Sequence, residues 1–130
     1  MGGRVRLTGV EHITLTVSDL DRASQWCRDV LGFEDMLRYR NDAIHRTCYV
    51  LTHPDLEGFV LSFMQCDGTA DGSFDERTLG LDHFSFGVGD RSSLDQWRSR
   101  LDRQGVTTRS LSFLEPRSLC SATLTTSSLS

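Results

Sequence analysis

The pattern of polar and apolar residues predicts a strand followed by a helix at the start of the chain. Polar and apolar residues alternate over His12–Val17, which is the two-residue period of a strand with two different faces. Apolar residues then recur every three or four positions over Leu20–Leu31, as in an amphipathic helix. Ser18 and Asp21 have capping-box spacing at its start, and we expect Gly32 to cap its end.

Three further segments predict strands, and turn-forming residues separate them. These segments are Phe33–Arg40, His45–Thr52 and Phe59–Cys66. Asn41-Asp42 favours a turn between the first two, and Pro54, which cannot donate a ladder hydrogen bond, lies between the last two. Residues 8–66 therefore predict one β-α-β-β-β module.

The strand and helix occur a second time, at an offset of 71 residues that places Gly9 on Gly80 and His12 on His83. Gln25-Trp26 likewise falls on Gln96-Trp97. Two long copies indicate a duplicated module rather than a solenoid, which needs more and shorter repeats. We predict the second strand over His83–Val88, and the second helix from Asp90, as its N-cap, to Gln104.

The repeat ends near Gly105, and the rest of the chain is rich in serine and threonine. The length that follows His83 accommodates at most one of the three further strands expected, near Thr108–Leu114. We therefore predict a linker over residues 67–79, a partial second module over 80–114, and a disordered or aberrant tail over 115–130. A chain that is truncated or read out of frame after Val106 is the simplest explanation.

Composition and charge exclude several classes of function. The chain has 130 residues, enough for one domain, and its net charge of −4 comes without a run of basic residues, which argues against a nucleic-acid-binding surface. No apolar stretch approaches the roughly 18 residues of a membrane span, and no signal-peptide pattern precedes the first strand. We therefore expect a cytoplasmic protein whose four cysteines, which form no C-x-x-C pair, are unpaired thiols.

His12 and His83 are the candidate metal ligands, because they occupy equivalent positions on the more polar face of two equivalent strands. Two imidazoles on facing strands begin a divalent-metal site, but such a site needs a further protein donor, commonly a carboxylate. The alternative is that each histidine only satisfies backbone groups near its own strand.

The segment GV-x-HITLTVSDLDRASQWCRDVLGF, followed by GLDHFSFGV and a second helix, resembles the vicinal oxygen chelate superfamily. This superfamily includes glyoxalase I, bleomycin and fosfomycin resistance proteins and extradiol dioxygenases. The resemblance covers residues 8–106. It implies an α+β fold of paired βαβββ modules, whose curved mixed sheet surrounds a central cleft, and in which His12 and His83 bind a divalent Fe, Mn, Ni, Co or Zn ion.

The chain departs from the family pattern at the carboxylate positions. Glyoxalase-like members place a glutamate on the last strand of the first module, where this chain has Ser62. The equivalent position of the second module would lie beyond Ser130, and the spacing of Glu115 does not make it a substitute. Loss of the first carboxylate alone would match the two-histidine, one-carboxylate site of extradiol dioxygenases, but the catalytic histidine that those enzymes place at the start of this strand is not matched, because Gly58 and Phe59 stand there. We interpret His45 and His53 as surface residues.

The resemblance implies a metal-dependent enzyme, a lyase or a dioxygenase, that acts on a small oxygenated substrate. The first alternative is a metal-free binding or sequestration module similar to the bleomycin resistance proteins, which Ser62 favours. The second alternative is a non-functional fragment. We also expect a homodimer, because an incomplete second sheet would expose apolar strand edges.

Overall fold

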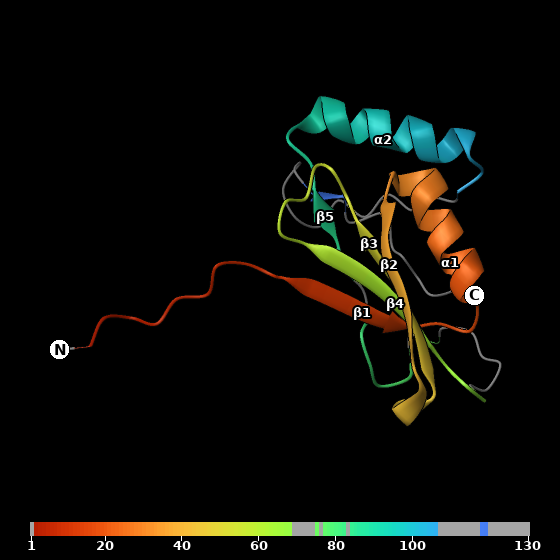
Figure 1. Cartoon of the computed structure of the whole chain (residues 1–130). Coiled ribbons are helices and arrows are strands. Elements are labelled where there is room, and N and C mark those ends of the chain that lie inside the picture. Colours follow the sequence, from red (N-terminus) through yellow and green to blue (C-terminus); the bar gives the residue numbers. More distant parts are fainter. Residues whose placement is uncertain (1, 69–74, 76, 83, 107–117, 120–130) are drawn as a thin grey trace. The chain divides into compact units, whose positions relative to one another are not determined.

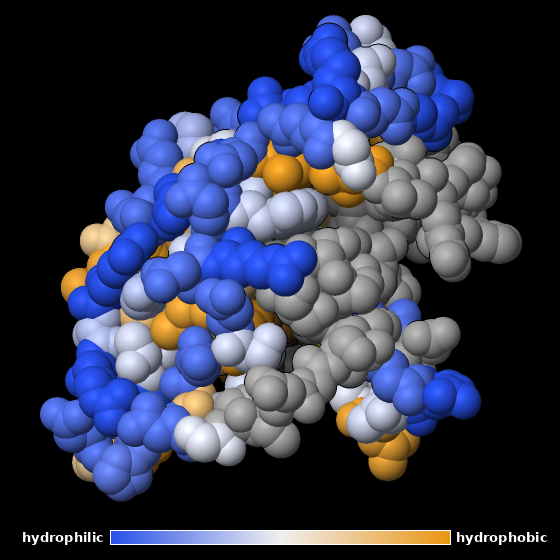
Figure 2. Space-filling view, turned by 90° about the vertical axis from the view of Figure 1, so that its right-hand side faces the viewer, coloured by the Kyte–Doolittle hydropathy of each residue, from blue (hydrophilic) through white to orange (hydrophobic). Residues whose placement is uncertain are grey.

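The computed structural model describes residues 2–68, 75, 77–82, 84–106 and 118–119. The chain divides into two compact units, Met1–Ala70 and Asp71–Ser130, and Figure 1 shows the strands and helices of each. Both units combine strands with a helix, so the predicted α+β class is confirmed. On the face shown in Figure 2, hydrophilic residues predominate and hydrophobic residues form patches between them.

The first unit has the predicted β-α-β-β-β order and one mixed sheet. Its strands lie side by side in the order β1-β4-β3-β2, with β1 parallel to β4 and the other neighbours antiparallel. The elements are β1 (His12–Thr16), α1 (Leu20–Trp26), a π-helical turn (Cys27–Leu31), β2 (Glu34–Asn41), a 3-10 turn (Asp42–Ile44), β3 (Arg46–Thr52) and β4 (Val60–Cys66).

Helix α1 begins at a different cap from the one that the sequence predicts. The N-cap is Asp19, whose carboxylate accepts a hydrogen bond of 3.0 Å from the backbone N–H of Arg22, so the prediction of Ser18 is wrong. Asp19 is extended and its carboxylate reaches a free N–H of the first turn, where a negative charge also suits the helix dipole. The predicted end is confirmed, because Gly32 adopts the left-handed conformation at a φ of 83°.

One face of the sheet packs against α1 and forms the core. The helix contacts β3 and β4, and the side chains of Leu51, Leu61 and Phe63 on these strands are fully buried. The hydroxyl of Tyr49, on β3, donates a 3.0 Å hydrogen bond to Asp21 on the helix. Since Leu15 and Phe63 share the level of Tyr49 across the sheet, all three side chains lie on the helix-covered face.

A bulge in β2 changes which of its residues face the helix. Strict alternation would place Asp35 and Leu37 on one side, but the pairing with β3 shifts between them, so that Asp35 pairs with Leu51 and Leu37 with Val50. The extra residue between them reverses the alternation. Asp35 therefore lies on the side of α1, and Leu37 lies on the opposite face.

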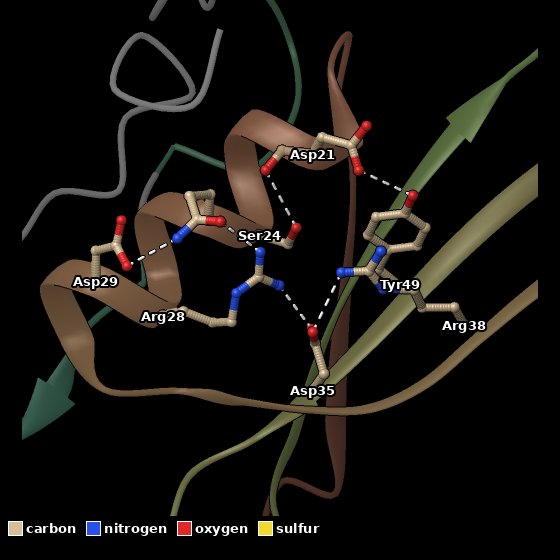
Figure 3. Close-up of polar contacts among 8 residues, drawn as sticks. Asp21, Ser24, Arg28, Asp29, Asp35, Arg38 and Tyr49 are labelled. Atoms are coloured by element: carbon tan, nitrogen blue, oxygen red, sulfur yellow. Dashed lines mark hydrogen bonds and ion pairs between the residues drawn. The ribbon is translucent and has the colours of Figure 1, made fainter.

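On the helix side, Asp35 joins the π-helical turn that follows α1 to β2 (Figure 3). Its carboxylate accepts hydrogen bonds from Arg28 at 2.7 Å and from Arg38 at 3.1 Å. The guanidinium carbon of Arg38 lies 4.2 Å from the centre of the Tyr49 ring, and Tyr49 in turn binds Asp21. Exposed ion pairs of this kind contribute little stability each.

His53, which we interpret from the sequence as a surface residue, is a structural residue of the first unit. Only 11% of its side chain is exposed, and its ring meets that of Phe33 edge to face at 5.0 Å. Its Nδ1 accepts the backbone N–H of Asp55 at 3.1 Å, so its Nε2 carries the proton and donates to the Leu31 carbonyl at 2.8 Å. A helix end has carbonyls without helical partners, and His53 satisfies one of them.

Replacing His53 with alanine should lower the free energy of unfolding by about 2 kcal/mol, because the partly buried Leu31 carbonyl loses its donor. Urea unfolding followed by circular dichroism measures this change. His45→Asn is the matched control, because His45 is exposed and asparagine tolerates its left-handed φ of 52°. An equal loss in the two variants would contradict the role of His53.

The second unit contains β5 (Phe86–Gly87), α2 (Arg91–Arg103) and β6 (Ser118–Leu119), and β5 pairs antiparallel with β6. The predicted cap of α2 is confirmed, because Asp90 accepts a 2.7 Å hydrogen bond from the N–H of Ser93. The strand is shorter than the predicted 83–88. The expected strand near 108–114 lies outside the described residues, and so does the 115–130 segment apart from β6.

Candidate ligand-binding face of the first sheet

The sheet face opposite α1 carries the side chains from which a site can be built. His12 pairs with Val60, and Thr14 pairs with Ser62, in the parallel register of β1 and β4. Neighbouring residues of a ladder point to the same side, and successive residues point to opposite sides. Because Leu15 and Phe63 face the helix, His12, Thr14 and Ser62 share the opposite face, called here the His12 face.

The imidazole of His12 is accessible on this face. Its side chain is 60% exposed, and its Nδ1 lies 3.6 Å from a carboxylate oxygen of Glu11. Within the part of the chain that the structure describes, the ring makes this one polar contact. Among the described residues, no hydrogen bond joins this imidazole to backbone groups of its strand, and the exposed side chain can be reached by a ligand or a metal ion.

Ser62 is buried on the same face and is tied to Thr14. It is 5% exposed, and its hydroxyl oxygen lies 2.6 Å from that of Thr14. In the sequence, Ser62 stands out only as the residue in place of a glutamate, and its partner Thr14 is not predicted. A lone hydroxyl residue in the apolar run FVLSFMQ, and a threonine two residues after His12, are the signals that point to this pair.

The described residues of the first unit do not form a metal site by themselves. Among residues 2–68, 75, 77–82, 84–106 and 118–119, no three His, Cys, Asp or Glu side chains are grouped to hold an ion. The His12 face provides one imidazole and a neutral hydroxyl pair, whereas a metal site needs at least three protein donors. His83 and Glu115 lie outside the described residues, so the pairing of the two histidines stays a prediction.

The family of the chain follows from its match to known proteins. A sequence model described as the Glyoxalase/Bleomycin resistance protein/Dioxygenase superfamily matches residues 11–113. The chain belongs to this superfamily. The resemblance drawn from the two strand-helix segments is thereby confirmed, and the match includes both β1 and the region of His83.

Solved structures of this superfamily share the fold. A glyoxylase/bleomycin resistance protein/dioxygenase domain from Frankia sp. EAN1pec is 33% identical, with a TM-score of 0.69 and coverage of 83% of this chain and 84% of that one. Glyoxalase I of Leishmania major is 20% identical, with a TM-score of 0.62 and coverage of 81% and 72%. A point mutant of the fosfomycin resistance protein FosX of Listeria monocytogenes, complexed with Mn(II) and 1S,2S-dihydroxypropylphosphonic acid, is 20% identical, with a TM-score of 0.56 and coverage of 80% and 75%.

A recess lies on the helix-covered side of the sheet, beside the start of α1. It encloses about 500 Å³ and is lined by Asp19, Leu20, Asp21, Thr47, Tyr49, Gln65, Cys66, Asp67 and Gly68. Its carboxylates already have partners in the protein. The hydrogen bond to Asp21 raises the pKa of Tyr49, and the hydrogen bonds from Arg40 lower the pKa of Asp67. We therefore assign Asp21 to the packing of α1 on the sheet, and Asp67 to an ion pair with Arg40 of β2.

No helix among the described residues is both long and apolar enough to cross a membrane.

Proposed function

We propose that this member of the superfamily binds a small oxygenated molecule on the His12 face, and that His12 and His83 are two of the ligands of a divalent metal ion there. The accessible imidazole of His12 carries the proposal, because it lies on the sheet face that the helix leaves open. The recurrence of histidine at the same position of the second copy supports it. FosX, which shares the fold, has been solved with Mn(II) and a phosphonic acid.

The residues of this chain would bind and orient such a ligand. A bound divalent ion supplies Lewis acidity toward substrate oxygens. His12 would bind as a neutral imidazole, since a ligating nitrogen must be deprotonated. The Glu11 carboxylate lies beside Nδ1 and would orient the ring, as carboxylates commonly do for metal-binding histidines.

The metal proposal predicts about one equivalent of bound divalent metal that depends on both histidines. Elemental analysis of the purified protein, followed by titration with Mn²⁺ after chelator treatment, measures it. We expect His12→Ala and His83→Ala each to weaken Mn²⁺ binding at least about tenfold, because each variant removes one ligand. His45→Asn should bind like the wild type. Metal binding that survives both alanine substitutions would refute the assignment.

The second candidate function is metal-free binding of a small molecule on the same face. Ser62 favours it, because a buried hydroxyl bound to Thr14 supplies no negative charge where a glyoxalase-like site would place a glutamate. A folded protein that holds no metal but still binds small oxygenated molecules in a His12-dependent manner would favour this function over the first.

A further inference from the structure

We propose that Thr14 donates a hydrogen bond to an oxygen of the ligand on the His12 face, and that Ser62 is the positioning residue that aligns its hydroxyl. The ligand would therefore present a carboxylate or carbonyl oxygen to Thr14. This inference rests on the proposed location of the ligand but requires no metal ion.

The direction of the Thr14–Ser62 hydrogen bond follows from burial. Each hydroxyl has one proton to donate and two lone pairs that accept, so a 2.6 Å pair uses only one of the two protons. Ser62 is 5% exposed. Among the described residues, the Thr14 hydroxyl is the side-chain group that forms a hydrogen bond with the Ser62 hydroxyl. A buried donor without an acceptor is costly, so the Ser62 hydroxyl donates to Thr14.

The proton of Thr14 is then available to a ligand. Thr14 is exposed, and among the described residues Ser62 is the hydrogen-bond partner shown for its hydroxyl, so the Thr14 proton has no acceptor there. A hydroxyl that accepts one hydrogen bond donates the next more strongly, because such chains polarise one another. Ser62 thus strengthens a donor that it does not itself present to the ligand.

The position of Thr14 relative to His12 sets the size of the ligand. The two residues are separated by one residue on β1 and face the same side, so their Cα atoms lie about 7 Å apart. A molecule with two oxygen-bearing groups a few bonds apart can reach both side chains. A short dicarboxylate has this chemistry, and succinate is a suitable probe.

Titration of the wild-type protein with succinate in the presence of EDTA, followed by NMR, tests the inference. We expect shifts at Thr14 and His12, with saturation at millimolar concentrations. Thr14→Val, which keeps the branched shape and removes the hydroxyl, should weaken binding about tenfold, as expected for a lost hydrogen bond to a charged group. Thr14→Ser should retain it, and Ser62→Ala should weaken binding severalfold.

Thr16→Val is the matched control, because Thr16 is exposed on the same strand and face and should leave the affinity unchanged. Wild-type protein that fails to bind succinate, or equal affinities for Thr14→Val and the wild type, would overturn the role of Thr14. If His12→Ala alone weakens binding, the ligand site stands and this inference fails. If neither His12→Ala nor Thr14→Val changes the affinity, the proposal that the ligand binds on the His12 face is refuted as well.

Discussion

Replacing Ser62 with glutamate should raise the affinity for a divalent metal ion about a hundredfold. Ser62 lies on the His12 face, two residues along β4 from Val60, the partner of His12. A carboxylate near a divalent cation gains several kcal/mol even at the effective dielectric constant of about 20 that describes charges in proteins, buried sites included. Desolvation of the buried carboxylate offsets part of this gain, and a net gain of about 2–3 kcal/mol corresponds to the hundredfold increase.

Titration of wild type and variant with Mn²⁺ measures the gain, and thermal melts verify that the larger side chain is accommodated. Ser62→Gln is the isosteric control, because it adds the same volume without the charge. The gain should disappear when His12→Ala is added, since the carboxylate and the imidazole would share one ion. Equal affinities for the glutamate and glutamine variants would show that this position does not face the metal.

Alkaline pH should destabilise the protein through Cys27 by up to about 4 kcal/mol. The Cys27 side chain is fully buried, and this burial raises the pKa of its thiol from 9.0 to about 12. The stability that the neutral thiol provides is fully present below pH 9. Between pH 9 and 12 the thiol ionises in the unfolded chain but not in the folded one, so stability falls by about 1.4 kcal/mol per pH unit.

Urea unfolding of wild type and Cys27→Ala from about pH 8 to 11 tests this linkage. The alanine variant should be less stable at about pH 8, because a buried side chain is truncated, but the difference should shrink by about 1.4 kcal/mol per unit above about pH 9. Tyr39 and Tyr49, whose pKa values are also raised, titrate in both proteins and cancel in the comparison. Cys66→Ala is the control, because the Cys66 thiol is partly exposed, and its stability should fall with pH as steeply as that of the wild type. If the stabilities of Cys27→Ala and wild type fall in parallel with pH, the assignment to Cys27 is refuted.

The sequence alone determined the order of elements in the first module and the family of the chain. Alternation over His12–Val17 and helical spacing over Leu20–Leu31 depend on residues close together along the chain, and the structure has both elements where these patterns place them. Gly32 and Asp90 were predictable for the same reason, because a left-handed turn and an N-cap each depend on a few neighbouring residues.

Choices between neighbouring candidates were decided by the folded structure. Ser18 and Asp19 are both good caps by residue type, and the path of the chain after β1 selects Asp19. The bulge between Asp35 and Leu37 arises from the pairing with β3, so a pattern read along β2 alone places Leu37 on the wrong face.

The chemistry of the His12 face also depends on tertiary structure. The sequence identified His12 as a candidate ligand and Ser62 as a departure from the family pattern, but the hydrogen bond of Ser62 to Thr14 spans 48 residues. His53 became a structural residue only through its contact with Leu31, 22 residues away. Local periodicity is a property of adjacent residues, whereas such pairs are set by strand register and helix packing, which minimise the number of buried polar groups without partners.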